Sequence, residues 1–152
     1  MIKKLNYLLA VGAITLTASC TSMQPINNEL NQPVPSSMTR AQVSEAILAV
    51  CGAEGWKVSQ NTLGKIVATY QNNDEQLATV EITFSEMNYN ITYVSSKEMD
   101  QEDSEIDANY NAWVNELSGA IQKELNQVSS SDNAQATSSN KQSSSDSANK
   151  NQ

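Results

Sequence analysis

The carboxylates between residues 98 and 107 are the densest group of potential metal ligands in this sequence. They are Glu98, Asp100, Glu102, Asp103, Glu105 and Asp107. Alternating oxygen ligands of this kind suit a hard cation such as Ca²⁺. An EF-hand loop, however, has Gly where this stretch has Glu105, and Glu where it has Asn111. The favoured interpretation is a solvated acidic loop before a helix N-terminus, with a calcium site as the alternative.

Residues for catalysis are scarce in the rest of the sequence. There is no histidine, which removes the usual general base and the commonest metal ligand. We find no Ser-His-Asp arrangement, no metal-ligand spacing and no glycine-rich phosphate loop. Cys51 lies in an apolar helical pattern, so we interpret it as a core residue, with an intermolecular disulfide as the alternative. We predict that the protein is not an enzyme and has no catalytic residues, metal or cofactor.

A second candidate for ligand binding is the polar face of the predicted strands. Its residues are Thr79, Glu81, Thr83, Asn88, Asn90 and Thr92. Hydroxyl and amide groups on such a face can hydrogen-bond sugars or peptides, although most such faces are simply the solvated side of a sheet. The aromatic residues are interpreted as core: Trp56, Tyr70, Tyr89, Tyr93 and Trp113.

Two helices and four strands are expected to position these residues. Thr39 and Gln42 have the spacing of a capping box, and apolar residues at intervals of three and four then predict a helix over 39–53. Apolar and polar residues alternate over 56–58, 65–70, 78–84 and 87–94, which predicts an antiparallel meander with one covered face. A longer apolar stripe predicts a last helix, capped by Ser104 or Asp107. The stripe is Ile106, Tyr110, Trp113, Val114, Leu117, Ile121 and Leu125.

The first twenty residues have the order of a secretory signal. Lys3 and Lys4 precede an apolar run over 5–18, which is shorter than the ~20 residues of a membrane-spanning helix, and small residues then lead into Cys20. This order resembles the lipobox of bacterial lipoproteins, in which the cysteine is lipid-modified and becomes the first residue of the mature chain. The resemblance implies a signal peptide over 1–19 and a lipidated Cys20 carrying a diacylglyceryl group and an amide-linked acyl chain. An ordinary secretory signal that leaves Cys20 as a free thiol is the alternative.

Together the elements predict an α+β fold. It is a two-layer sandwich, in which an antiparallel β-meander of three to four strands carries an N-terminal and a C-terminal helix on one face. We expect this domain over residues 38–127. Residues 20–37 contain three prolines and no periodicity, which predicts a lipid anchor and flexible tether. Residues 128–152 are rich in Ser, Asn and Gln, which predicts a disordered tail.

The charge balance limits the partners. With 9 basic and 17 acidic residues the net charge is −8. Such a chain is poorly suited to nucleic acid and to electrostatic docking on anionic lipid. We therefore expect no nucleic acid, and a membrane contact that depends on the lipid at Cys20.

A family resemblance adds to this interpretation. The segment 109–117, with 38–40 and Gly55-Trp56, resembles a group of small proteobacterial lipoproteins of unassigned function, in which an NYNxWVxNL-like segment opens the final helix. Glu116 differs from the Asn expected near that point. The small lipoprotein of the outer-membrane barrel-assembly machine is a weaker match, because its Gly-x-Pro after the first helix is absent here.

The resemblance implies a location, and no activity. In a Gram-negative cell this is the periplasmic face of the outer membrane, and otherwise the extracytoplasmic face of the cell membrane. We expect a lipid-anchored envelope protein whose small non-catalytic domain binds or scaffolds another envelope component, either an envelope protein or peptidoglycan. The alternative is a binding module for a cell-wall or small polar ligand on the exposed sheet face.

Overall fold

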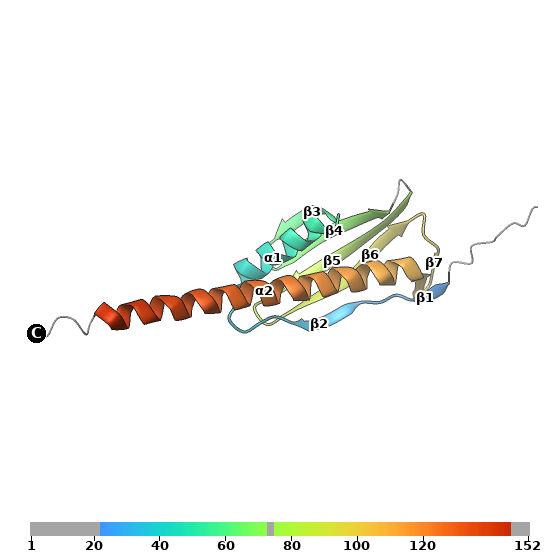
Figure 1. Ribbon diagram of the computed structural model, residues 1–152. Helices are drawn as coiled ribbons and strands as arrows, with labels where there is room; N and C mark the ends of the chain where they lie inside the picture. Colours follow the sequence, from blue (N-terminus) through green and yellow to red (C-terminus); the bar gives the residue numbers. More distant parts are fainter. Residues whose placement is uncertain (1–21, 73–74, 147–152) are drawn as a thin grey trace, which may run out of the picture.

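The computed structural model describes residues 22–72 and 75–146, with side chains as far as residue 135 (Figure 1). Its fold is α+β: two helices pack against two antiparallel sheets, of three and five strands. The elements in chain order are β1 (Met23–Pro25), β2 (Glu29–Pro33), α1 (Arg40–Ala53), β3 (Lys57–Thr62), β4 (Lys65–Asn72), β5 (Gln76–Phe84), β6 (Asn88–Lys97), β7 (Gln101–Glu102), β8 (Glu105–Asp107) and α2 (Ala108–Asp146).

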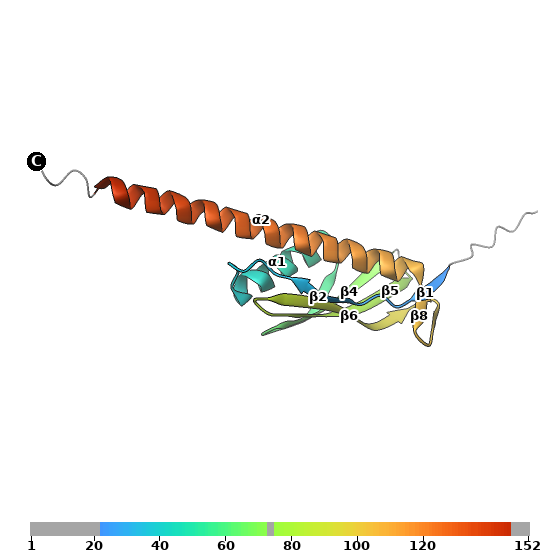
Figure 2. The ribbon, with the colours of Figure 1, turned by 90° about the horizontal axis from the view of Figure 1, so that it is seen from below.

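The larger sheet has the strand order β2-β6-β5-β4-β3. Its strands β3 to β6 form the expected meander, and β5 alternates strictly, with every second residue from Ala78 to Phe84 buried. Across the sheet Ile82 lies opposite Ile66 on β4 and Ile91 on β6. Because side chains alternate along a strand, this register collects the apolar residues on one face. Both helices lie on the same side of this sheet (Figure 2).

The first helix begins where the sequence predicts. The backbone N–H of Thr39 donates to Gln42 Oε1 at 2.8 Å, and the N–H of Gln42 donates to Thr39 Oγ1 at 3.3 Å. This reciprocal pair satisfies two N–H groups that have no partner within the helix. The prediction of a helix over 39–53 is confirmed by α1.

The second helix also has the predicted cap. Asp107 Oδ1 accepts a hydrogen bond from the Asn109 N–H at 2.9 Å, and the Asp107 side chain is almost fully buried. From the predicted stripe, the helix buries Tyr110, Val114, Leu117, Ile121 and Leu125 completely. Ile106 is also buried, but it belongs to β8 and not to the helix.

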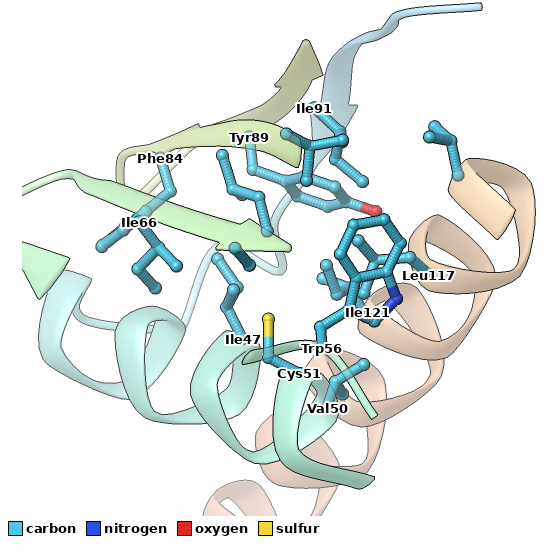
Figure 3. Packing of buried hydrophobic residues seen from close by; sticks show 14 of the residues in the cluster. Ile47, Val50, Cys51, Trp56, Ile66, Phe84, Tyr89, Ile91, Leu117 and Ile121 are labelled. Atoms are coloured by element: carbon cyan, nitrogen blue, oxygen red, sulfur yellow. The ribbon is translucent and has the colours of Figure 1, made fainter. Parts of the chain in front are cut away.

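A single apolar core lies between the sheet and the two helices (Figure 3). Ile47 and Cys51 from α1 meet Leu117 and Ile121 from α2 over the buried face of the sheet. Tyr89 extends from β6 into this layer, and its hydroxyl is 3.1 Å from both the carbonyl oxygen and the Oγ of Ser118. The phenol is therefore buried without leaving its polar atom unpaired.

The expected tether is wrong for residues 22–37. In the structure, β1 pairs with β8 and β2 pairs with β6, and Val34 is buried in the core. The segment is ordered although it has no apolar periodicity, because backbone hydrogen bonds and asparagine side chains hold most of it in place. Asn111 Oδ1 accepts from the Asn27 N–H at 2.9 Å, and Asn111 Nδ2 donates to the Pro25 carbonyl at 2.9 Å.

The same asparagine pattern extends along the segment. Asn27 Nδ2 donates to Asn115 Oδ1 at 2.7 Å, and the Tyr93 N–H donates to Asn28 Oδ1 at 2.8 Å. Asn111 and Asn115 belong to the segment 109–117 at the start of α2. In this protein they bind the first segment of the domain to the last helix.

The expected disorder from residue 128 is also wrong for the described part of the chain. Helix α2 continues to Asp146. Val128 packs against the core, Ser129 Oγ lies 2.8 Å from Ser37 Oγ, and Gln42 Nε2 donates to Asp132 Oδ2. These contacts to α1 and the segment before it extend the helix beyond the end of its apolar stripe.

Candidate functional site

The predicted lipidation site, Cys20, lies outside the described residues. The first described residue, Ser22, is tied to the fold, because its carbonyl oxygen accepts a hydrogen bond from the Ala108 N–H at 3.1 Å. Strand β1 begins one residue later. The lipidation of Cys20 stays a prediction, but the domain starts close behind it.

The acidic stretch 98–107 forms a turn and the two short strands β7 and β8. Glu98 and Asp103 adopt positive φ angles of 52° and 50°, as residues in tight turns do. Asp107 faces inward and caps α2, whereas Glu102 and Glu105 are exposed. Among the residues described, no three acidic, cysteine or histidine side chains are grouped so that they could hold a metal ion. The geometry thus offers no support for the calcium alternative.

Cys51 is fully buried on the inner face of α1 (Figure 3). Burial raises the pKa of its thiol to about 11, because the charged thiolate would lose its hydration. A thiol that stays protonated at neutral pH is a poor nucleophile. The prediction of a core residue is confirmed.

The polar sheet face has the expected residues, but they bind one another. Thr79 Oγ1 lies 2.9 Å from Thr69 Oγ1, and Asn90 Nδ2 donates to Thr83 Oγ1 at 3.0 Å. Glu81 forms an ion pair with Lys65 at 3.4 Å. Asn88 and Thr92 hydrogen-bond within their own strand pair and turn. A sugar or peptide on this face would have to compete with these bonds.

A small cavity of about 80 Å³ lies where the end of α1, the strand β4 and the first turns of α2 meet. We call it the aromatic–acidic cavity. It is lined by Glu54, Trp56, Tyr70, Trp113, Glu116 and Leu117. The interpretation of the aromatic residues as core is correct for Trp56, which is 4% exposed, but Tyr70 and Trp113 are only half-buried.

The local sequence explains how the cavity is built. Helix α1 ends at Ala53 with Glu54 as its C-cap, and Gly55 then adopts φ +79°, a conformation that a side chain would strain. This turn brings Trp56 back to the end of the helix, where the backbone N–H of Trp56 donates to the Cys51 carbonyl oxygen at 2.8 Å. The ring of Tyr70 lies between the two tryptophans, with centroid distances of 5.3 Å to Trp56 and 4.9 Å to Trp113.

The electrostatic character of the aromatic–acidic cavity is negative. Glu54 and Glu116 approach it from different helices, and neither has an ion-pair partner in the described part of the chain. The last turn of α1 contains no basic residue that would offset the negative end of the helix dipole. Two local patterns in the sequence contain residues of this site: Glu54-Gly55-Trp56, and the i,i+3 pair Trp113 and Glu116. Neither pattern predicts that the two segments are neighbours in the fold.

A wider open groove of about 360 Å³ lies between the start of α1 and the β3–β4 hairpin. Arg40 and Ala41 form one wall, and Leu63 and Phe84 the other. Leu63 at the hairpin tip is 86% exposed. This groove is more apolar than the aromatic–acidic cavity and has no comparable group of charges.

Comparison of the chain with models of protein families, with curated proteins and with solved structures found no match in any of the three.

Proposed function

We propose that the protein is a lipid-anchored cell-envelope lipoprotein whose two-layer sandwich domain is non-catalytic and binds or scaffolds another envelope component. The order of basic, apolar and small residues before Cys20 supports the anchor. In Gram-negative bacteria its place would be the periplasmic face of the outer membrane, and otherwise the extracytoplasmic face of the cell membrane.

The observation that carries this proposal is the short distance between the lipidation site and the folded domain. Cys20 and Ser22 are two chain steps apart, which is at most ~7 Å. Ser22 is held to the first residue of α2 by the Ala108 hydrogen bond. Acyl chains on Cys20 would therefore hold the domain at the bilayer by the end that contains β1, β8 and the start of α2.

The shape of the molecule gives this attachment a direction. Helix α2 has 39 residues, so it is about 58 Å long at ~1.5 Å per residue. It runs from the β1 end past the whole sheet to the opposite end of the molecule (Figures 1 and 2). No helix among the described residues is both long and apolar enough to cross a membrane. We infer that α2 leads away from the bilayer and presents its C-terminal half to a component beyond the membrane surface.

A non-catalytic role is supported by the side chains available. Histidine is absent from the sequence, and Cys51 is buried with a raised pKa. The alternative, a ligand-binding module on the open sheet face, is weakened because the polar groups of that face are engaged with one another.

The anchor is tested by the mass of the mature N-terminal peptide and by fractionation of cells. The proposal expects a triacylated Cys20, and release of a Cys20→Ser variant from the membrane fraction. Cys51→Ser is the matched control, since it changes the other cysteine and leaves the anchor intact. An unmodified Cys20 in the membrane-bound protein would overturn the anchor.

The scaffolding role needs a separate measurement. Photo-crosslinkers placed in living cells at exposed positions of α2, such as Asn126, should capture one recurrent envelope component. The same crosslinker at exposed Gln60 on β3, an edge strand of the larger sheet, is the control. Repeated absence of a specific product from α2 would count against a scaffold that acts through this helix.

A further inference from the structure

We infer that the aromatic–acidic cavity is a binding site for a single primary ammonium group on an alkyl stem, as in a lysine-type side chain or another diamino acid. The inference depends on the folded domain alone and goes beyond the proposed anchor and scaffold. If both hold, the ammonium group belongs to the envelope component that the domain contacts.

The size of the cavity limits the ligand. At about 80 Å³ it has room for a few water-sized groups. Sites for drug-sized molecules are several times larger, at roughly 300–1,000 Å³. The cavity is therefore too small for a sugar ring but large enough for an ammonium group with its first methylene groups.

The walls of the cavity suit a positive charge. Trp56, Tyr70 and Trp113 are neighbours in one row of rings beside the cavity, and Tyr70 and Trp113 are partly exposed. Indole and phenol rings attract cations within about 6 Å. Glu54 and Glu116 add two carboxylates that can accept hydrogen bonds from the same ammonium. The carboxylates suit the charged end of a lysine-type side chain, whose apolar stem can lie along the partly exposed rings of Tyr70 and Trp113.

In the described part of the chain, no basic side chain balances the negative charge of Glu54 and Glu116 at the cavity. Helix α1 ends against it with no Lys or Arg in its last turn, although a helix C-terminus favours a positive charge. No described Lys or Arg side chain pairs with Glu54 or Glu116, whereas Glu81 on the sheet is paired with Lys65. A cation from outside the chain would meet two sources of negative potential at once: the pair of carboxylates and the C-terminal end of the helix.

The two tryptophans make the site directly observable. They are the only tryptophans in the sequence, and both line the cavity. The full chain is titrated with Nα-acetyl-lysine amide at constant ionic strength while tryptophan fluorescence and the two indole N–H signals in NMR spectra are recorded. We expect a saturable change in both, and no such change with the Nε-acetylated compound, which keeps the stem but lacks the charge.

Charge-neutral variants test the carboxylates. Glu116→Gln and Glu54→Gln should each weaken binding by about fivefold, and the two together by more than tenfold, as expected for solvent-accessible ion pairs of up to ~1 kcal/mol. Glu45→Gln, at an exposed position on α1 away from the cavity, makes the same change in net charge and should leave binding unaltered. Equal weakening by Glu45→Gln would reduce the effect to overall charge and overturn the site.

Three other results would also overturn the inference. They are no saturation with the lysine probe, equal binding of its Nε-acetylated form, and tighter binding of choline or N-acetylglucosamine than of the lysine probe. Each variant must give the same circular dichroism spectrum as the unsubstituted protein. If a Gln variant loses its fold as well as binding, the Glu116→Asp variant provides the test in its place. That variant keeps the charge and should retain binding within about threefold.

Discussion

Two polar segments flank the regular part of the sequence, residues 22–37 and 128–135, and the fold holds them in different ways. The first pairs its backbone with β8 and β6 and buries Val34 in the core, four residues before the buried Met38. The second continues a helix whose apolar stripe has ended, and it touches the domain through Val128 and two hydrogen-bonded side chains. Two segments of similar polar composition are therefore integrated into the fold to very different depths.

The difference shows where order comes from in a segment without apolar periodicity. A strand can be ordered by a neighbouring strand edge, because each paired backbone group replaces a bond to water. A helix satisfies its own backbone and gains stability from packing, which is sparse beyond Leu125. The first segment should therefore be part of the cooperative fold, and the second only an extension of it.

The largest expected effect comes from Met38, the buried residue that directly follows the first segment. Met38 is 4% exposed, so Met38→Ala should lower the free energy of unfolding by about 2–5 kcal/mol. Val128→Ala, at a partly buried site in the second segment, should cost less than about 1.5 kcal/mol. Urea unfolding followed by tryptophan fluorescence measures both, and equal losses would contradict the difference in depth.

Alkaline pH tests the burial of Cys51 in the core to which Val34 of the first segment also belongs. The pKa of this thiol is raised by burial from its ordinary value near 9 to about 11. The stabilisation is complete below pH 9 and is lost as the pH rises toward 11, because the unfolded chain releases its proton first. A rise of two pKa units corresponds to a loss of about 3 kcal/mol in the free energy of unfolding once the pH exceeds 11.

Burial also raises the pKa values of Tyr89 and Tyr110, which extends the loss to higher pH. The free energy of unfolding, measured in urea at pH 8 to 11, should fall in this window. Cys51→Ala is the control, since its stability should depend less on pH between 9 and 11. An unchanged pH profile in this variant would show that Cys51 is not the group responsible.

The asparagine contacts allow a finer test of the first segment. Asn111→Ala removes the acceptor of the Asn27 N–H and the donor to the Pro25 carbonyl, and should cost about 1–3 kcal/mol. Hydrogen exchange should become faster at the Asn27 amide. Asn126→Ala, farther along α2, removes a bond to the preceding turn of the same helix and should cost less than about 0.5 kcal/mol.

The smallest effect is expected in the second segment. Ser129→Ala removes the bond to Ser37, a loss of about 0.5–1.5 kcal/mol, but alanine favours the helix by about 0.5 kcal/mol. The net change should lie within about 1 kcal/mol. A double-mutant cycle with Ser37→Ala isolates the pair, and a coupling energy well above this value would mean that the second segment is held as firmly as the first.

Local patterns in the sequence are sufficient to predict the elements that carry their own signals. The capping box at Thr39 and the cap at Asp107 mark the starts of α1 and α2, and alternation identifies four strands of the larger sheet. The fifth strand, β2, and the sheet of β1, β8 and β7 are not predictable in this way. Their residues form strands because other strands lie beside them.

The candidate site shows the same limit. Trp56, Tyr70 and Trp113 fit apolar positions in a strand, a second strand and a helix, so each is correctly expected to face inward. The partial exposure of Tyr70 and Trp113 beside one cavity arises because the end of α1, the strand β4 and the start of α2 meet at the margin of the core. Such a margin is a property of packing and has no local signature.

The sequence by itself determined the periodic elements, their caps, the acidic balance and the cysteine expected to carry lipid, because each depends on residue types at short spacing. The tertiary structure alone decided that residues 22–37 belong to the sheets, and that two carboxylates and three aromatic rings surround one small cavity. These features depend on contacts between residues far apart in the chain. Only the closing of the sheet against both helices brings those residues together.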